Sequence, residues 1–115
     1  MGDMNRDAET FHIASEQFGE RTTAKLDGSI TIDSSPELRR ALFRILRSPV
    51  CRQLALDFSA VDYIDTSGLA VLIEALRLAT QLDKSLQLTE LRERPRYLLE
   101  STGILRLFDK TVTKQ

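Results

Sequence analysis

Residues 54–82 constrain the fold more than any other part of the chain. They begin with a short apolar run, 54–58, that has the length and composition of a buried strand. They end with a long helical periodicity of apolar residues that starts at Leu69. Between the two lies Asp-Thr-Ser-Gly, at 65–68. A strand that leads into a helix through a short turn places that turn at the carboxyl edge of a sheet, where α/β proteins tend to keep their sites.

The Asp-Thr-Ser-Gly turn has the chemistry of a helix start. Asp65 is a good N-cap, because its carboxylate can accept the free amide hydrogens of the first helical turn. Thr66, Ser67 and Gly68 would then be the first three helical residues, at the positive end of the helix dipole. A hydroxyl at Ser67 would be exposed there, and a phosphate added to it would occupy a position that favours anions. Gly68 would let another backbone approach closely.

The simplest interpretation of these four residues is a helix start with good capping residues and no further role. An aspartic protease site is excluded, because its motif is Asp-Thr-Gly or Asp-Ser-Gly without the extra residue. Such a site also needs two carboxylates that share one proton.

The length and the cysteine and histidine content limit the classes of protein that the chain can belong to. Its 115 residues predict a single domain, 1–115, that can bury a core without metals or disulfides. Cys51 is the only cysteine, so no internal disulfide can form, and a reducing, cytoplasmic compartment is expected. His12 is the only histidine and is interpreted as a strand side chain. A His-dependent catalytic triad and a Cys/His zinc site are therefore not expected. No cofactor is expected either.

Charge and hydropathy exclude further classes. The first nine residues are polar, so no signal peptide is expected, and no apolar run reaches the ~20 residues that span a bilayer. We therefore expect no membrane insertion. Sixteen basic residues against seventeen acidic ones give a net charge of −1, so direct binding to nucleic acid is not expected either.

The remaining periodicities predict a mixed α/β domain. We expect strands at 10–18, 21–26, 54–58 and 86–91, helices starting near 34–37, 65–68 and 94–95, and a last apolar segment at 104–108 that is an edge strand or a short packed piece. Polar residues at 1–9 and 109–115 predict a disordered arm and a frayed tail. Alternating strands and helices favour a mostly parallel sheet of four to five strands with helices packed against it. The tight turn at 19–20 makes the first strand pair antiparallel.

Local details of the helices stay open. In the first helix, Ser35 is the cap if Pro36 is the first helical residue, while Ser34 with Glu37 would form a competing capping box. Before that helix, Ile30 and Ile32 form a short apolar step. The second helix carries two adjacent apolar stripes, so either a neighbouring helix or a docked partner covers the second stripe. The stripes are Leu69, Leu72, Ile73, Leu76 and Ala79, and Val71, Ala75, Leu78 and Leu82.

Four arginines gather on the first helix. Arg40, Arg44 and Arg47 share one face, and Arg39 lies beside them. The face is either simply solvated or complementary to an acidic patch on a partner.

Four motifs follow one another in a fixed order along the chain. They are Gly-Ser-Ile-Thr-Ile-Asp-Ser-Ser-Pro-Glu-Leu-Arg at 28–39, Leu-Asp-Phe-Ser at 56–59, Tyr-Ile-Asp-Thr-Ser-Gly-Leu at 63–69 and Ser-Thr-Gly-Ile at 101–104. In this order they resemble the STAS domain and, more narrowly, the bacterial anti-sigma factor antagonists. The resemblance extends over roughly residues 10–108.

The resemblance implies a binding protein, not an enzyme. In that family, the unmodified antagonist binds an anti-sigma factor that is also a serine kinase, and the sigma factor is released to RNA polymerase. The kinase then phosphorylates the serine before Gly-Leu, which is Ser67 here, and a serine phosphatase reverses the switch. Thr66 is a minor candidate acceptor. The implied partner-binding residues are Asp33, Asp62, Asp65, Thr66, Ser67, Gly68 and Leu69.

Two features depart from the family pattern. Ser29 and Thr31 stand where relatives often carry an acidic pair, and Asp33 is the nearest acidic residue. The chain also ends soon after Phe108, so the family's usual C-terminal helix is expected to be missing. Two other functions stay open: a STAS subunit that braces the ATPase of a lipid ABC transport complex without a phosphorylation switch, and a sensor that binds a small anion at the Ser67 helix start.

Overall fold

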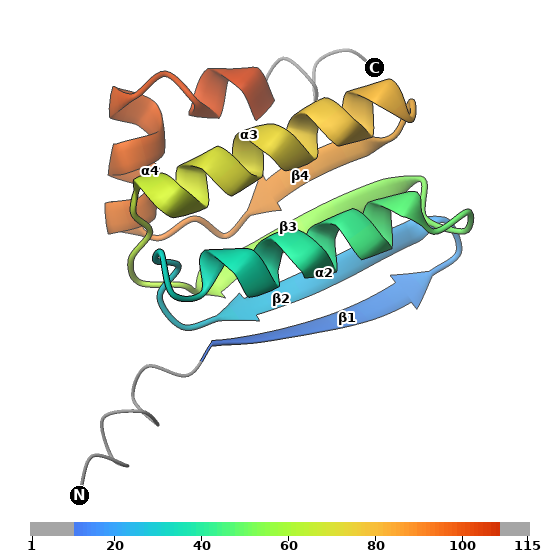
Figure 1. Cartoon of the computed structure of the whole chain (residues 1–115), viewed down its shortest axis with the longest axis horizontal. Coiled ribbons are helices and arrows are strands. Elements are labelled where there is room, and N and C mark those ends of the chain that lie inside the picture. The colour runs from blue at the N-terminus through green and yellow to red at the C-terminus, as the bar shows by residue number, and fades with distance from the viewer. Residues whose placement is uncertain (1–10, 109–115) are drawn as a thin grey trace, which may run out of the picture.

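The computed structural model describes residues 11–108, which form one four-stranded sheet covered by helices (Figure 1). The expectations for the arm at 1–9 and the tail at 109–115 lie outside these residues. The strands are β1 His12–Phe18, β2 Arg21–Asp27, β3 Gln53–Ala60 and β4 Ser85–Thr89, and they lie in the order β1-β2-β3-β4. β1 is antiparallel to β2, while β2, β3 and β4 are parallel. The predicted fold class is therefore confirmed.

The helices are α2 Ser35–Arg47, α3 Thr66–Gln81 and α4 Glu93–Ser101, followed by helical residues at 105–108. α2 and α3 lie side by side on one face of the sheet (Figure 1). Both begin at the end toward which β2, β3 and β4 point, and α4 lies at this same end. The topology thus gathers the starts of these helices at the carboxyl edge of the parallel strands.

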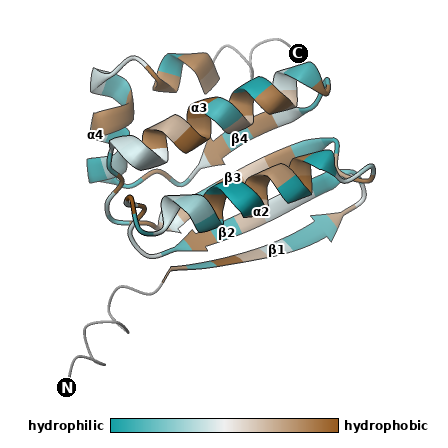
Figure 2. Ribbon diagram, viewed as in Figure 1, coloured by the Kyte–Doolittle hydropathy of each residue, from teal (hydrophilic) through white to brown (hydrophobic). Residues whose placement is uncertain are grey.

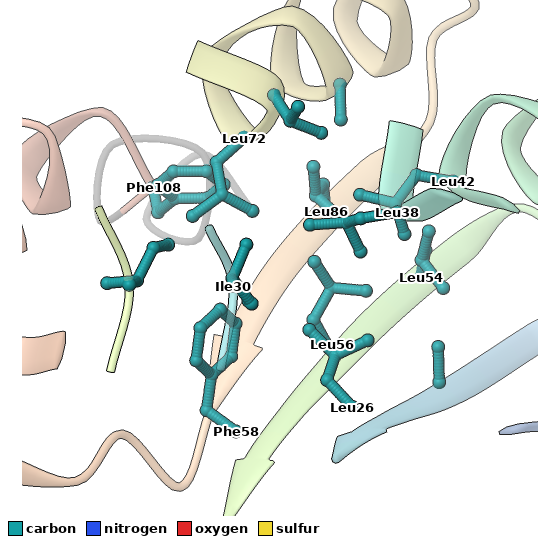
Figure 3. Close-up of a cluster of buried hydrophobic side chains, with 14 of the residues drawn as sticks. Leu26, Ile30, Leu38, Leu42, Leu54, Leu56, Phe58, Leu72, Leu86 and Phe108 are labelled. Carbon is teal, nitrogen blue, oxygen red and sulfur yellow. The ribbon is translucent and has the colours of Figure 1, made fainter. Parts of the chain in front are cut away.

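The core lies between the sheet and the two long helices, and apolar periodicity explains its composition. β2 alternates, with Ala24 and Leu26 fully buried, while α2 buries one stripe and exposes the rest. Figure 2 shows the contrast between the helices, because α3 is apolar over most of its length and α2 is more hydrophilic. Figure 3 shows the side chains that meet in the centre. They include Leu26, Ile30, Leu38, Leu42, Leu54, Leu56, Phe58, Leu72 and Leu86. Each such side chain stabilises the fold by about 1.5–3 kcal/mol through burial.

Both apolar stripes of α3 are mostly covered within the chain, although Ile73 and Leu76 of the first stripe are only partly buried. α2 packs alongside α3, and Val71, Ala75 and Leu78 of the second stripe are buried. Leu82 is the exception, with 38% of its surface exposed at the end of the helix. Phe108 joins the same core cluster as Leu72 (Figure 3). The sequence left open whether a neighbouring helix or a docked partner covers the second stripe. In the structure, the neighbouring helix α2 packs alongside it.

The structure corrects two local predictions. Ile32 is 70% exposed although Ile30 is fully buried, because the chain turns at 31–34 and carries Ile32 outward. β4 ends at Thr89 and not at 91, because Glu90 adopts a left-handed backbone conformation with φ of 57°.

The segment at 104–108 is the short packed piece and not the edge strand, since residues 105–108 are helical and Phe108 is buried. Gly103, with φ of 81°, ends α4 and redirects the chain into a new helical turn that buries Phe108. The expectation that the family's usual C-terminal helix is missing concerns the residues after Phe108, which lie outside the described residues.

Candidate functional site

The start of α3 is capped as the sequence predicts. The Asp65 carboxylate accepts hydrogen bonds from the amides of Ser67 at 2.9 Å and Gly68 at 3.3 Å. The Leu69 amide donates the first helical bond to the Asp65 carbonyl, at 3.1 Å. Thr66, Ser67 and Gly68 are accordingly the first three helical residues.

Backbone hydrogen bonds hold the turn before α3 against the loop before α2. Ile30 and Ile64 form an isolated parallel bridge beyond the ends of β2 and β3. The Ile30 amide donates to the Tyr63 carbonyl at 2.9 Å, and the Asp65 amide donates to the Ile30 carbonyl at 3.0 Å. The two loops that carry most of the predicted site residues are therefore fixed side by side.

Gly68 is required by side chains and not, as predicted, by an approaching backbone. A Cβ atom at this position would lie 2.6 Å from Ile30 Cγ2 and 2.6 Å from Ile64 Cγ1. Both isoleucines are buried, so neither can easily move away. The first turn of α3 consequently rests directly on the bridge between the two loops.

The Ser67 hydroxyl is free and accessible. Ser67 is partly buried, and within residues 11–108 its side chain makes no hydrogen bond. Every buried side-chain oxygen and nitrogen among these residues has a hydrogen-bond partner, so the unbonded Ser67 oxygen must reach solvent. Thr66 is exposed beside it. The turn thus presents a hydroxyl at the positive end of a 16-residue helix.

The Ser34 side chain settles the alternatives left open for the start of α2. Ser34 is the N-cap residue, so Pro36 is the second helical residue, and no side chain caps the helix. Its hydroxyl instead accepts from the Thr31 amide at 2.9 Å and donates to the Ser29 carbonyl at 2.8 Å. Neither proposed arrangement, the Ser35 cap or the capping box of Ser34 with Glu37, is formed.

The acidic residues predicted to contact a partner lie on exposed loops around this turn. Asp33 is exposed, and its amide donates to the Thr31 hydroxyl at 3.2 Å. Asp62 is exposed and forms an ion pair with Arg92 at 3.8 Å. Leu69 is only 5% exposed, so any effect of Leu69 on a partner would be indirect, through packing.

A hollow beside the turn was not predicted from the sequence. It has a volume of about 530 Å³ and lies between the turn and α4. Its lining residues are Tyr63, Ile64, Glu93, Arg94, Tyr97 and Leu98. These include both tyrosines of the chain, and this pair is the one sequence signal that could have indicated the hollow. The Arg94 guanidinium stacks over the Tyr63 ring, 5.0 Å from its centroid.

Two of the four α2 arginines are held by contacts within the chain. Arg39 bonds Glu74 of α3 at 2.8 Å and lies over the Phe43 ring at 4.4 Å. Arg47 lies over the same ring at 5.4 Å. Arg40 and Arg44 are exposed and form no ion pair within the described part of the chain.

Residues 11–108 contain neither a candidate metal site nor a candidate membrane span. No three His, Cys, Asp or Glu side chains are grouped so that they could hold a metal ion. No helix in this range has both the length and the apolar character needed to cross a bilayer. His12 is exposed on β1, and Cys51 is buried.

Comparison with known proteins gives one family and a set of similar folds. The matching family model is described as Mlab, STAS domain, and it matches residues 13–109. An anti-sigma factor antagonist from Mycobacterium paratuberculosis is 18% identical with a TM-score of 0.79, and the match covers 92% of this chain and 94% of that one. The phosphorylated form of the Bacillus cell fate determinant SpoIIAA is 14% identical with a TM-score of 0.66, covering 81% and 85%.

The same fold also occurs as part of a much larger protein. The murine Solute Carrier 26 family member A9 anion transporter is 10% identical with a TM-score of 0.77, and the match covers 90% of this chain but 20% of the transporter. At such identities these solved structures establish the fold.

Proposed function

The chain belongs to the STAS domain family, and we propose that within this family it is an anti-sigma factor antagonist that is switched by phosphorylation of Ser67. The unmodified protein binds an anti-sigma factor with serine kinase activity, and the sigma factor is released. The kinase then phosphorylates Ser67 and ends the binding, and a serine phosphatase restores it. The protein is thus a binder and a substrate, it acts in the cytoplasm, and it needs no cofactor.

One observation carries this proposal. Within residues 11–108 the Ser67 hydroxyl makes no hydrogen bond, and it reaches solvent at the start of α3, where the Asp65 cap fixes its backbone. A kinase needs a hydroxyl that it can reach and that no internal hydrogen bond occupies. The similarity of the fold to anti-sigma factor antagonists, one of them described in its phosphorylated form, supports the same conclusion.

The local electrostatics suit a switch that acts on a partner. A phosphate adds about −1.5 to −2 charges beside the Asp65 carboxylate, which already bonds the Ser67 amide. The helix dipole offsets this repulsion by only about 0.3–1 kcal/mol. A partner packed over the unmodified serine would have to desolvate the phosphate, which costs several kcal/mol unless a cation pairs with it. Since about 1.4 kcal/mol is tenfold in affinity, a loss of about 10²-fold or more needs no large change in shape.

Phosphorylation by candidate kinases tests the proposal directly. The protein is incubated with ATP and each anti-sigma factor kinase encoded by the same genome, and its mass is measured. One added phosphate is expected on the wild type, little or none on Ser67→Ala, and the full amount on Thr66→Ala. If no kinase phosphorylates the wild type, or if Ser67→Ala gains the phosphate equally well, the phosphorylation switch at Ser67 is ruled out.

A second candidate function is a STAS subunit or module of a transport complex, in which the domain braces an ATPase without a phosphorylation switch. The observation that favours a transport role, although not the ATPase itself, is the occurrence of this fold in an anion transporter of which the match covers 20%. In that case the protein would purify in a stable complex with an ATPase, and Ser67→Asp would leave that complex intact.

A further inference from the structure

The hollow beside the α3 start has the composition of an anchor site for a protein partner. Tyr97 is 71% exposed and Tyr63 is 38% exposed, and both line it together with the apolar side chains of Ile64 and Leu98. Tyrosine and arginine are enriched among the residues that dominate the energy of protein interfaces. A volume of about 530 Å³ accommodates one large side chain and its neighbours.

This hollow and the Ser67 turn form one rigid unit. Tyr63 and Ile64 immediately precede the Asp65 cap, and the Tyr63 carbonyl accepts the Ile30 amide at 2.9 Å. Ile64 lines the hollow and also lies against Gly68, where an added Cβ would meet it at 2.6 Å. A protein that covers Ser67 would therefore lie next to the hollow and meet it in a defined geometry.

The charges around the hollow leave one cation available. Arg92 pairs with Asp62 at 3.8 Å, and Arg96 pairs with Glu100 at 3.7 Å. Arg94, between them, has no carboxylate within 4.0 Å among the described residues and stacks only on the Tyr63 ring. A stacked guanidinium keeps its edge free to donate two parallel hydrogen bonds to a carboxylate.

Because Glu93 also lines the hollow, the site is close to neutral. Its affinity would come mainly from apolar contact, and Arg94 would set the orientation of the bound segment.

We propose that the hollow between the 61–65 turn and α4 is a second contact for the anti-sigma factor, which inserts an apolar or aromatic side chain flanked by an acidic residue. The apolar side chain lies between Tyr63 and Tyr97, and the acidic residue bonds Arg94. This inference rests on the proposed function, because the same partner covers Ser67. Phosphorylation then removes one part of a two-part interface and leaves the α4 part unchanged.

The test measures binding of the kinase that phosphorylates Ser67 to the full chain by calorimetry. Tyr97→Ala is expected to weaken binding about tenfold or more, since truncating a central aromatic anchor has effects of this size. Arg94→Glu is expected to weaken it by a similar factor and to slow association at low salt. At saturating kinase both variants still gain one phosphate, which separates a lost anchor from a lost phosphorylation site.

Phe18→Ala is the matched control. Phe18 is an aromatic residue with 80% of its surface exposed, at the end of β1 that lies away from the α3 start (Figure 1). This variant is expected to bind within twofold of the wild type. Unchanged thermal unfolding of Tyr97→Ala shows that its fold is retained.

Three results would overturn the inference. If Tyr97→Ala and Arg94→Glu both bind the kinase as tightly as the wild type does, the whole interface lies at the Ser67 turn. If the wild type self-associates and Tyr97→Ala does not, the hollow binds a second copy of the chain. A wild type that neither binds nor is phosphorylated by any such kinase removes the proposed function and this inference with it.

Discussion

Two serines occupy the starts of neighbouring helices, and the structure uses them in opposite ways. Ser34 precedes α2 and is only 8% exposed, and its hydroxyl bonds the Thr31 amide and the Ser29 carbonyl. Ser67 lies in the first turn of α3, where Asp65 caps the helix and the serine hydroxyl has no hydrogen-bond partner in the described part of the chain. Both helices start at the same edge of the sheet, so the difference does not come from the architecture (Figure 1).

The difference comes from which side chain forms hydrogen bonds with the free backbone groups at each helix start. At α3 the Asp65 carboxylate accepts hydrogen bonds from the free amides, so the Ser67 hydroxyl is not needed to cap the helix. At α2 no carboxylate is in position, and the serine itself is needed to hold the loop. A serine at a helix start is thus a candidate for modification only when another residue does the structural work. The following predictions test that distinction, from the largest expected effect to the smallest.

Ser67→Asp is expected to weaken binding of the anti-sigma factor about 10²-fold, which corresponds to about 2.7 kcal/mol. The reason is that a permanent negative charge would be desolvated beside Asp65 in the complex. Ser67→Ala should bind as tightly as the wild type and stay bound in the presence of ATP. Isothermal calorimetry with each variant measures this, and equal affinities of wild type and Ser67→Asp would contradict it.

Gly68→Ala is expected to lower the free energy of unfolding by about 1–3 kcal/mol, because the added methyl group overpacks against Ile30 and Ile64. Alanine favours helix by about 1 kcal/mol over glycine, so a net loss must come from this contact. Urea denaturation measures the difference. Thr66→Ala, in the same turn but exposed, serves as the control and should stay close to the wild type. A stabilised Gly68→Ala would show that the isoleucines can move aside.

Ser34→Ala is expected to lower the free energy of unfolding by about 1–2 kcal/mol, because the Thr31 amide and the Ser29 carbonyl lose their partner. Ser35→Ala is a close control, since Ser35 is also 8% exposed and its side chain makes no hydrogen bond in residues 11–108. Urea midpoints of the two variants should therefore differ. Equal midpoints would mean that water replaces the Ser34 hydroxyl without cost.

Asp65→Ala is expected to lower the free energy of unfolding by about 1 kcal/mol, the usual effect of losing an N-cap. Asp65→Asn should recover most of this loss, because its side-chain oxygen can accept the same amides. Thermal unfolding of the three proteins ranks them. If Asp65→Asn were as unstable as Asp65→Ala, the charge of Asp65 and not its hydrogen bonds would be what matters at this helix start.

The order of the elements and the chemistry of the α3 start were predictable because they depend on neighbours in the sequence. An N-cap acts on amides two and three residues ahead, and helical or strand periodicity appears within a few turns. The same local reasoning failed at Ile32, where a turn at 31–34 overrides apolar character. It also left the start of α2 undecided between a Ser35 cap and a capping box of Ser34 with Glu37, and neither is formed.

Contacts between distant segments were beyond that reasoning. The hollow joins Tyr63 to Tyr97 only because α4 returns to the edge where α3 begins. The sequence indicated a close approach at Gly68. The residues that require the glycine, Ile30 and Ile64, come together through a backbone bridge outside the regular strands.

The sequence by itself therefore determined the α/β order, the mixed sheet and the capped helix start that carries Ser67. These follow from capping, periodicity and turn chemistry, which act over a few residues. Only the tertiary structure decided that both tyrosines line one hollow and that Ile30 and Ile64 meet at Gly68. The Ser34 bonds are local, but the sequence offers that hydroxyl several nearby partners, and only the folded loop shows which ones it takes.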